Sequence, residues 1–398
     1  MKLYIITTAA PPVLDGIGHY TASLVEVLQK EDPSLQITVF APDGLGAYEP
    51  LNGAAVRTDF RIDDISTCNR FAAILRSEKP DWVFLQYQSF SYGKWGRNPV
   101  LPRVLKEARE SVPGMRLATM IHEAFVVPNS EFSVANLKRA VFHTWQKKQF
   151  CDLVQISDVA FCSTESWIRE FNPWFPGKTI HHLPVGSNMP LVPVDGGKTE
   201  AKKRLGIPED HLVVGLFGTA HASRMNDSVQ TALEAVKKAG KKPFLLYIGP
   251  DAQKFGASIP PTMPSLMEGP FPGEEVSRRL QAIDISLSLF IDGVAARRGS
   301  FIAALQHSVA TVGIVGGNTD SWLRDGDGFV RVILNQDDIV LQQGDTTFND
   351  RFHDAVYSLA ADDDLRDQYA SKARALFEER FAWEKIAQTI LQKFDDGK

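Results

Sequence analysis

The chain has 398 residues, which is more than one ordinary core accommodates and suits two domains. With 44% hydrophobic and 23% charged residues, its composition is that of a globular protein. The formal net charge of −5 excludes bulk attraction to nucleic acid or to an anionic membrane, so any anion site must be a local patch.

The first half of the chain alternates short apolar runs with longer helical patterns. "KLYIITTA" at the N-terminus predicts a buried strand and not a signal peptide, because Pro11 and Pro12 interrupt it before a cleavage-like site. A helical pattern over "HYTASLVEVLQK" follows, and the later predicted strands are "LQITVFA", "DWVFLQYQ", "RLATMIHE" and "VAFCST". Parallel strands need such crossovers, so the pattern predicts an α/β sheet with helices on both faces.

A second series of strands follows a break in the pattern. The segment "SNMPLVPVDGGKTEAKKRLGIPED" has prolines, a Gly-Gly pair and no strand pattern, and we expect the linker there. The next predicted strands are "HLVVGLFG", "KPFLLYIG", "DISLSLF" and "ATVGIV". We therefore expect two doubly wound domains, over residues 1–190 and 205–380. A last helix within 381–398 has one apolar face, which can pack back on the first domain or on the second.

The cysteines and the hydropathy restrict the cellular setting. Cys68, Cys151 and Cys162 are odd in number and lack metal-ligand spacing, which fits thiols in a reducing compartment and no metal site. No run approaches the ~18 apolar residues of a membrane span. We expect a cytoplasmic protein without a transmembrane segment. The basic stretch "HTWQKKQF" is either a solvated helix face or a peripheral contact with a membrane-borne acceptor.

Candidate site residues lie where predicted strands of the first half end, the usual position of ligand sites in open α/β sheets. Gly16 and Gly18 in "PPVLDGIGHY" form either a plain turn or a phosphate or sugar contact; Thr21 replaces the third glycine of a full dinucleotide fingerprint. His122 and Glu123 end the strand "RLATMIHE", so His122 is either a structural histidine or a site residue.

Aromatic residues gather after the strand "DWVFLQYQ". Tyr87, Phe90, Tyr92 and Trp95 can stack on the apolar faces of a sugar while Gln86 donates or accepts hydrogen bonds. Alternatively, about half of these rings pack against neighbouring helices. The tentative acceptor-side residues are Gln86, Tyr87, Tyr92, Trp95 and Glu123.

Three arginines mark the second half. Arg224 follows the strand "HLVVGLFG", and Arg297 and Arg298 precede the helix "SFIAALQHS". Three guanidinium groups on one rim with few local acids suit a diphosphate, because they bind it through planar forks. The alternative is a solvated basic turn. The other expected contacts to the anion come from backbone and hydroxyl groups in the same two loops, at Gly218, Thr219, Gly299, Ser300 and Phe301.

The order of the motifs resembles family 4 of the retaining glycosyltransferases, which have the GT-B fold of two Rossmann-like domains facing a central cleft. The resemblance rests on "PPVLDGIGHYTASLVEVL", "FLQYQSFSYG", "MIHEAF", "HLPVGSNMP", "LFGTAHASR", "RRGSFIAAL" and "FAWEKIA", and it spans nearly the whole chain. It implies a nucleotide-diphosphate sugar donor bound mainly by the second domain and an acceptor received mainly by the first. It also implies transfer with retention and without a metal or other cofactor.

The resemblance also implies roles for individual residues. Gly16, Gly18 and His19 would contact the donor phosphate or sugar, and His122 would lie beside the transferred sugar. Arg224 would stabilise the leaving diphosphate.

One departure from the family pattern concerns two glutamates. Ala295 and Ala303 stand where family members commonly carry them, so Arg298 would supply positive charge and the ribose would be bound differently. The nucleotide, the sugar and the acceptor, whether glycan, lipid-linked glycan or small molecule, stay open. A nucleotide-sugar epimerase, a phosphorylase and a non-catalytic binding protein remain alternatives.

Overall fold

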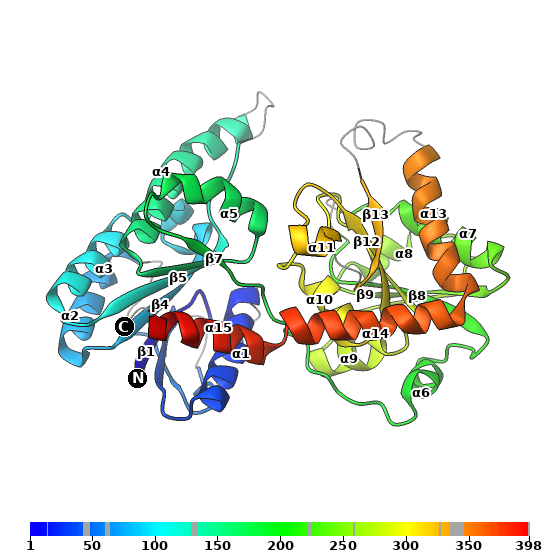
Figure 1. The fold of residues 1–398 in the computed structure, drawn as a ribbon, viewed down its shortest axis with the longest axis horizontal. Helices are drawn as coiled ribbons and strands as arrows, with labels where there is room; N and C mark the ends of the chain where they lie inside the picture. The colour runs from blue at the N-terminus through cyan, green and yellow to red at the C-terminus, as the bar shows by residue number, and fades with distance from the viewer. Residues whose placement is uncertain are drawn as a thin grey trace. The chain divides into compact units, whose positions relative to one another are not determined.

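The computed structural model describes residues 1–13, 15–42, 48–59, 64–128, 134–220, 224–257, 259–325, 328–334 and 346–396. The chain divides into two compact units (Figure 1). Unit 1 comprises Met1–Ser163, Trp167–Pro184 and Trp383–Lys398, and unit 2 comprises Thr164–Ser166 and Val185–Ala382.

Unit 1 is built on a seven-stranded parallel sheet in the order β3-β2-β1-β4-β5-β6-β7. Its strands are β1 (Lys2–Ile6), β2 (Gln36–Phe40), β3 (Ala55–Arg57), β4 (Trp82–Gln88), β5 (Arg116–Glu123), β6 (Val159–Cys162) and β7 (Ile180–His182). The α-helices in this part of the chain are α1 (Gly16–Glu31), α2 (Cys68–Glu78), α3 (Val100–Ser111), α4 (Val134–Ile156) and α5 (Glu165–Phe171). The 3-10 turns are η1 (Ile65–Thr67), η2 (Ser89–Ser91), η3 (Lys94–Gly96) and η4 (Asn172–Trp174).

Unit 2 contains a six-stranded parallel sheet in the order β10-β9-β8-β11-β12-β13. Its strands are β8 (His211–Phe217), β9 (Lys242–Ile248), β10 (Ser265–Glu268), β11 (Ile285–Ser288), β12 (Ala310–Val315) and β13 (Val330–Ile333). Its helices are α6 (Gly197–Arg204), α7 (Ser228–Lys238), α8 (Ala252–Gly256), α9 (Gly273–Leu280), α10 (Gly299–Gln306), α11 (Ser321–Asp325), α13 (Thr346–Ala361) and α14 (Asp363–Arg380). The predicted fold class, α/β with two parallel sheets, is confirmed.

Both faces of the second sheet are buried, which explains its continuous apolar strands. Val214 of β8 packs in one cluster with Leu233 of α7, while its neighbour Val213 packs in another with Leu280 of α9. Successive side chains of a strand point to opposite faces, so helices must cover both. All six residues of β12 are buried.

The Pro/Gly-rich segment after residue 186 is attached to unit 2 by hydrogen bonds and apolar contacts. The backbone N–H of Val192 donates to Ser277 Oγ at 2.9 Å, and Gln281 Nε2 donates to the carbonyl of Val192 at 2.7 Å. Val194 is buried in the apolar cluster that contains Val213. The segment in which we expect the linker therefore packs on the second unit.

The last helix, α15 (Trp383–Asp396), packs on the first sheet and returns the chain to unit 1 (Figure 1). The Phe394 ring stacks on Trp82 of β4, with centroids 4.1 Å apart and planes at 10°. Trp383 contacts the ring of Tyr20 in α1 at 5.1 Å. In the described ranges, no helix has the length and apolar character that crossing a membrane requires.

Candidate functional site

Polar side chains gather at the carboxyl ends of the strands in each unit. In unit 1 they come from α1, β4 and β5, and we call Tyr20, Gln86 and His122 the histidine cluster. In unit 2 they come from the segments after β8 and β11, and we call Arg224, Asp292, Arg297 and Arg298 the arginine cluster. The two clusters belong to different units and are described separately.

Asp15 organises the β1–α1 turn. Its Oδ1 accepts hydrogen bonds from the backbone N–H of Gly18 at 2.7 Å and from Thr8 Oγ1 at 2.8 Å, so it caps α1. His19 Nδ1 lies 2.8 Å from the carbonyl oxygen of Asp15. Gly18 is required by packing, because a Cβ there would lie 3.0 Å from the carbonyl of Ala9. Sequence reasoning noted the glycines and missed Asp15, whose position before a helical run was the available signal.

His122 is held by two partners in the histidine cluster. Its Nε2 lies 2.9 Å from Gln86 Oε1, and its ring meets the Tyr20 ring edge-on at 4.9 Å. With Gln86 Oε1 as acceptor, Nε2 carries the proton and Nδ1 is an acceptor. Burial lowers the pKa of His122 to about 4, with the charge of Asp15 opposing the shift. The imidazole is therefore neutral at pH 7.

Two buried polar groups of this cluster lack a hydrogen-bond partner among the described residues. They are Gln86 Nε2 and the Tyr20 hydroxyl, on side chains that are 0% and 3% exposed. A buried unpaired polar group costs free energy, so such groups are candidates for contact with water or ligand. Tyr20 was not predicted as a site residue, since it lies inside an amphipathic helix pattern.

Glu123 is part of a polar chain beside the cluster. Gln88 Nε2 donates to Glu123 Oε2 at 2.7 Å, and Ser91 Oγ donates to Gln88 Oε1 at 2.7 Å. The β4–β5 pairing places Gln88 opposite Glu123. Gln88 was not singled out by the sequence, because only the strand register identifies this neighbour.

The expected acceptor-side roles of Tyr87 and Tyr92 are corrected by their burial. Both side chains are 0% exposed, and their rings lie 5.0 Å apart in the core. The Tyr92 hydroxyl donates to the carbonyl of Gln86 at 2.6 Å, so η2 folds this ring back under β4. Burial raises the pKa of both phenols. Phe90 and Trp95, at 41% and 56% exposure, are the rings of this segment that reach solvent.

In unit 2 the guanidinium groups of Arg224 and Arg298 both contact the ring of Phe290. Their central carbons lie 4.6 and 4.4 Å from its centroid. Arg224 Nη2 also donates to the carbonyl of Phe217 at 2.9 Å and to Ser300 Oγ at 3.0 Å. Burial, assisted by the charge of Arg298, lowers the pKa of Arg224 to about 10, so it stays protonated at pH 7. The structure thus brings these two predicted residues together.

One acid, Asp292, lies within the arginine cluster. It pairs with Arg297 at 3.0 Å and with Arg298, and it accepts a hydrogen bond from Asn318 Nδ2 at 3.2 Å. Gly293, at φ +93°, makes the turn that returns the chain toward the arginines. The cluster therefore combines three positive charges with one negative charge.

Backbone groups complete the arginine cluster. Gly299 begins α10, and the first N–H groups of a helix have no intrahelical partner. The Phe301 side chain is 0% exposed and meets the Phe329 ring edge-on at 5.2 Å, so only its backbone suits a ligand contact. Gly218 adopts φ +103°, and its carbonyl accepts a hydrogen bond from Tyr247 at 2.8 Å. Thr219 is exposed beside it.

The two positions at which the family commonly has glutamate are buried by the surrounding side chains. Ala295 and Ala303 are both 0% exposed. A carboxylate at either position would be buried in apolar surroundings or would displace its neighbours. In the described residues no group of three histidine, cysteine or acidic side chains suits a metal ion.

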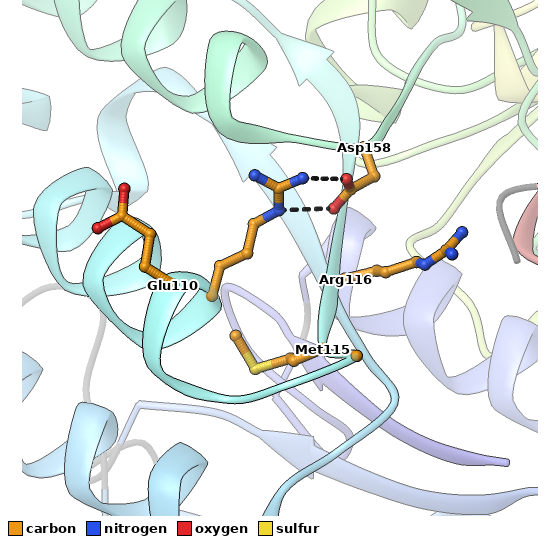
Figure 2. Close-up of a pocket in the computed structure, with 6 residues that line it drawn as sticks. Glu110, Met115, Arg116 and Asp158 are labelled. Carbon is orange, nitrogen blue, oxygen red and sulfur yellow. Dashed lines mark hydrogen bonds and ion pairs between the residues drawn. The ribbon is translucent and has the colours of Figure 1, made fainter.

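A pocket of about 450 Å³ lies at the amino-terminal edge of the first sheet, and no residue of the histidine cluster lines it (Figure 2). Arg116, which begins β5, and Asp158, which precedes β6, line it. Asp158 pairs with Arg109 through both oxygens and accepts from the backbone N–H of Leu117 at 2.9 Å. These contacts of Asp158 stabilise the edge of the sheet, so we do not assign the functional site to this pocket.

Comparison with known proteins finds similarity at the level of structure. No family model matches the sequence, and no curated protein matches it. A glycosyltransferase from Rickettsia africae matches with a TM-score of 0.67 and 11% identity, over 100% of this chain and 98% of the other. Anabaena HepE in complex with UDP and glucose matches with a TM-score of 0.63 and 12% identity, over 100% of both chains.

An enzyme of another class shares the architecture. A putative UDP-N-acetylglucosamine 2-epimerase from Listeria monocytogenes matches with a TM-score of 0.57 and 13% identity, over 98% of this chain and 94% of the other. At such identities, similarity establishes the fold and leaves the reaction open. The chain has the GT-B fold, in which glycosyltransferase structures are its structural relatives.

Proposed function

We propose that the protein is a retaining, metal-independent glycosyltransferase that uses a nucleotide-diphosphate sugar. The observation that carries the proposal is the arginine cluster, where Arg224 and Arg298 share the Phe290 ring beside Ser300 and the start of α10. It contains the donor groups that a diphosphate requires: guanidinium forks, a hydroxyl and helix N–H groups.

The chemistry of sugar transfer explains why such a cluster is useful. Breaking the anomeric bond leaves increasing negative charge on the diphosphate. Positive groups fixed beforehand by Phe217, Phe290 and Ser300 stabilise this charge more than the ground state, which lowers the barrier. No protein nucleophile is needed in this proposal.

Unit 1 contributes hydrogen-bonding groups suited to a sugar. His122 is neutral, so it binds hydroxyl groups without attracting a second anion. Gln86 Nε2 and the Tyr20 hydroxyl are unused donors in the same cluster. We propose that this cluster binds sugar hydroxyls.

The similarity to a putative epimerase supports a second candidate, a nucleotide-sugar epimerase. Product analysis separates the two reactions. An epimerase converts the donor into an isomer without acceptor, whereas a glycosyltransferase releases nucleoside diphosphate and extends an acceptor. Tight binding without either product would indicate a non-catalytic binding protein.

The diphosphate site is tested with Arg298→Ala and with a thermal-shift panel of nucleosides, nucleoside diphosphates and their sugars. A ligand that binds only the native state raises the melting temperature. We expect Arg298→Ala to weaken diphosphate binding by roughly 1.5 to 3 kcal/mol, the range for a hydrogen bond to a charged group, and to leave nucleoside binding nearly unchanged. Arg298→Lys should restore only part of the lost diphosphate affinity, because the single ammonium group of lysine cannot make the paired hydrogen bonds of a guanidinium group.

The matched control is Arg204→Ala, in which an exposed arginine of α6 that pairs with Glu200 is removed. It should bind every ligand as the wild type does. Equal diphosphate affinities of the wild type and Arg298→Ala in calorimetry would remove Arg298 from the site.

A further inference from the structure

An exposed apolar surface lies on unit 1, formed by the segment after β4 and the first half of α4. We call it the α4 surface, and its large exposed residues are Phe90, Trp95, Val134, Leu137 and Val141. Trp95, Leu137 and Val134 are 56%, 68% and 73% exposed. Contiguous exposed apolar side chains are unusual on a soluble monomer and indicate an interaction site.

The two segments form one surface through aromatic contacts. The Trp95 ring stacks on Phe142 of α4, with centroids 5.3 Å apart and planes at 12°, and Phe90 meets the same ring edge-on at 6.3 Å. Trp145 Nε1 donates to the carbonyl of Trp95 at 3.1 Å. The loop is thus fixed to the helix.

The first half of α4 exposes apolar side chains as well as basic ones. Val134, Leu137 and Val141 share a helical face and are exposed, whereas Gln146 and Gln149 are buried. Gln146 Oε1 accepts from the backbone N–H of Val126 at 2.9 Å, and Gln149 Oε1 accepts from that of Asn98 at 2.6 Å. The second half of α4 is anchored in the core by Phe150, Leu153 and Val154 as well as by these two hydrogen bonds, whereas the apolar side chains of the first half are exposed.

The exposed side chain of Trp95 is carried by a residue with a strained backbone conformation. It adopts φ 61° and ψ 24°, the left-handed region that a bulky residue rarely occupies. Hydrogen bonds from Trp145 and Gln146 to its carbonyl maintain this conformation. Strain retained at an exposed aromatic residue supports a functional role.

The α4 surface is basic although the chain is acidic overall. Residues 89–106 and 134–151 contain no aspartate or glutamate, while the chain has a net charge of −5. Lys94, Arg97, Lys138 and Arg139 lie in these ranges, as do Lys147 and Lys148. Lys148 pairs with Asp152; Lys138 and Arg139 are exposed, and no ion pair joins either to an acidic side chain among the described residues.

We propose that the α4 surface binds the surface of an anionic lipid bilayer. Trp95, Phe90 and the aliphatic side chains would enter the boundary between headgroups and acyl chains, where tryptophan is favoured. The basic side chains would contact anionic headgroups, each contributing about a fivefold change in affinity, which corresponds to ~1 kcal/mol. The proposal does not depend on the reaction proposed above.

Vesicle flotation tests the proposal with the full-length protein. We expect binding to vesicles of phosphatidylcholine with phosphatidylglycerol, and little binding to phosphatidylcholine alone. Lys138→Gln with Arg139→Gln should weaken binding about thirtyfold, from ~1 kcal/mol per basic side chain. Leu137→Glu should weaken it as well, and the exposure of Leu137 ensures that the fold survives.

The matched control is Lys237→Gln with Lys238→Gln, two adjacent exposed lysines on α7, which should bind vesicles as the wild type does. The Lys138/Arg139 variant should keep the wild-type affinity for nucleoside diphosphates, so vesicle binding and the proposed function are tested separately. No binding to anionic vesicles, equal binding to neutral ones, or wild-type binding by both α4 variants would overturn the proposal.

Discussion

At Phe290, two guanidinium groups lie against one aromatic ring. The quadrupole of the ring attracts both cations, which would otherwise repel each other in a partly desolvated place. Asp292 adds a carboxylate that pairs with Arg297 and Arg298 and is 25% exposed. In the proposed anion site, Asp292 therefore competes with an entering phosphate for Arg297 and Arg298.

Asp292→Asn should strengthen the binding of nucleoside diphosphate or inorganic pyrophosphate. It removes the competing charge and keeps one oxygen as acceptor for the guanidinium groups. We expect about fivefold tighter binding, from ~1 kcal/mol for a partly exposed charge pair, with a steeper dependence on salt. Calorimetry at two salt concentrations measures both effects. Weaker binding would show that Asp292 instead positions the arginines.

His122 should remain neutral through the physiological pH range. Its pKa of about 4 in the folded state lies below the ordinary value of 6.5, so the unfolded chain binds the extra proton. Stability should therefore be complete above pH 6.5 and fall as the pH decreases toward 4, by at most about 3 kcal/mol. NMR titration measures the pKa, with the resonance assigned by its loss in His122→Gln. A midpoint near 6.5 would contradict the assignment.

At the scale of elements, the turns after the strands fix the positions of the site residues. The turn after β8 depends on Gly218, where φ is +103° and a Cβ would lie 2.9 Å from Arg224 Nη2. The turn after β1 depends on Gly18 for close packing. Gly218 leaves the space that Arg224 occupies, and Gly18 lets α1 approach the backbone of Ala9.

Gly218→Ala should weaken diphosphate binding beyond its effect on stability. The added Cβ pushes Arg224 from Ser300 and Phe290, and the positive φ costs about 1 kcal/mol. Gly240→Ala is the control, since Gly240 has φ +75° but no atom within 4 Å of its Cβ position. Both variants should unfold more easily. Equal diphosphate affinities of Gly218→Ala and Gly240→Ala would show that the position of Arg224 does not depend on the turn at Gly218.

The sequence predicts the elements better than the contacts between them. Apolar strands alternating with helices predict the inner strands of both sheets, because burial of both faces demands apolar residues at every position. The edge strands β3, β7, β10 and β13 are less buried and were not predicted. Tyr92 could not be assigned to core or surface, since this depends on the fold of η2, whereas Tyr87 lies within β4, which is buried on both faces. Asp292 was missed because a turn at Gly293 brings it back to Arg298.

At the scale of the whole molecule, the first unit is discontinuous in sequence. The chain leaves it at Pro184 and returns at Trp383, and α15 then covers Trp82 and Phe84 of β4 with the ring of Phe394. Phe394 is 0% exposed, so the sheet of the first unit depends on the last residues of the chain.

Phe394→Ala should destabilise unit 1 selectively, by about 3 to 5 kcal/mol, the usual cost of removing a buried phenylalanine. Hydrogen exchange measures each unit separately: amides of β1 and β4 should lose protection, while those of β8 and β11 should not. Gln392→Ala, at an exposed position of the same helix, is the control. A uniform loss of protection in both sheets would show that the units unfold as one.

The same discontinuity delays the completion of the first unit during protein synthesis. About 200 residues separate Pro184 from Trp383, so at about 5 to 20 residues per second a ribosome needs roughly 10 to 40 s to reach α15. During that interval the second unit emerges and can fold. The side chains of Trp82 and Phe84 are not yet covered by Phe394. The nascent first sheet therefore exposes apolar surface at Trp82 and Phe84 until α15 has emerged.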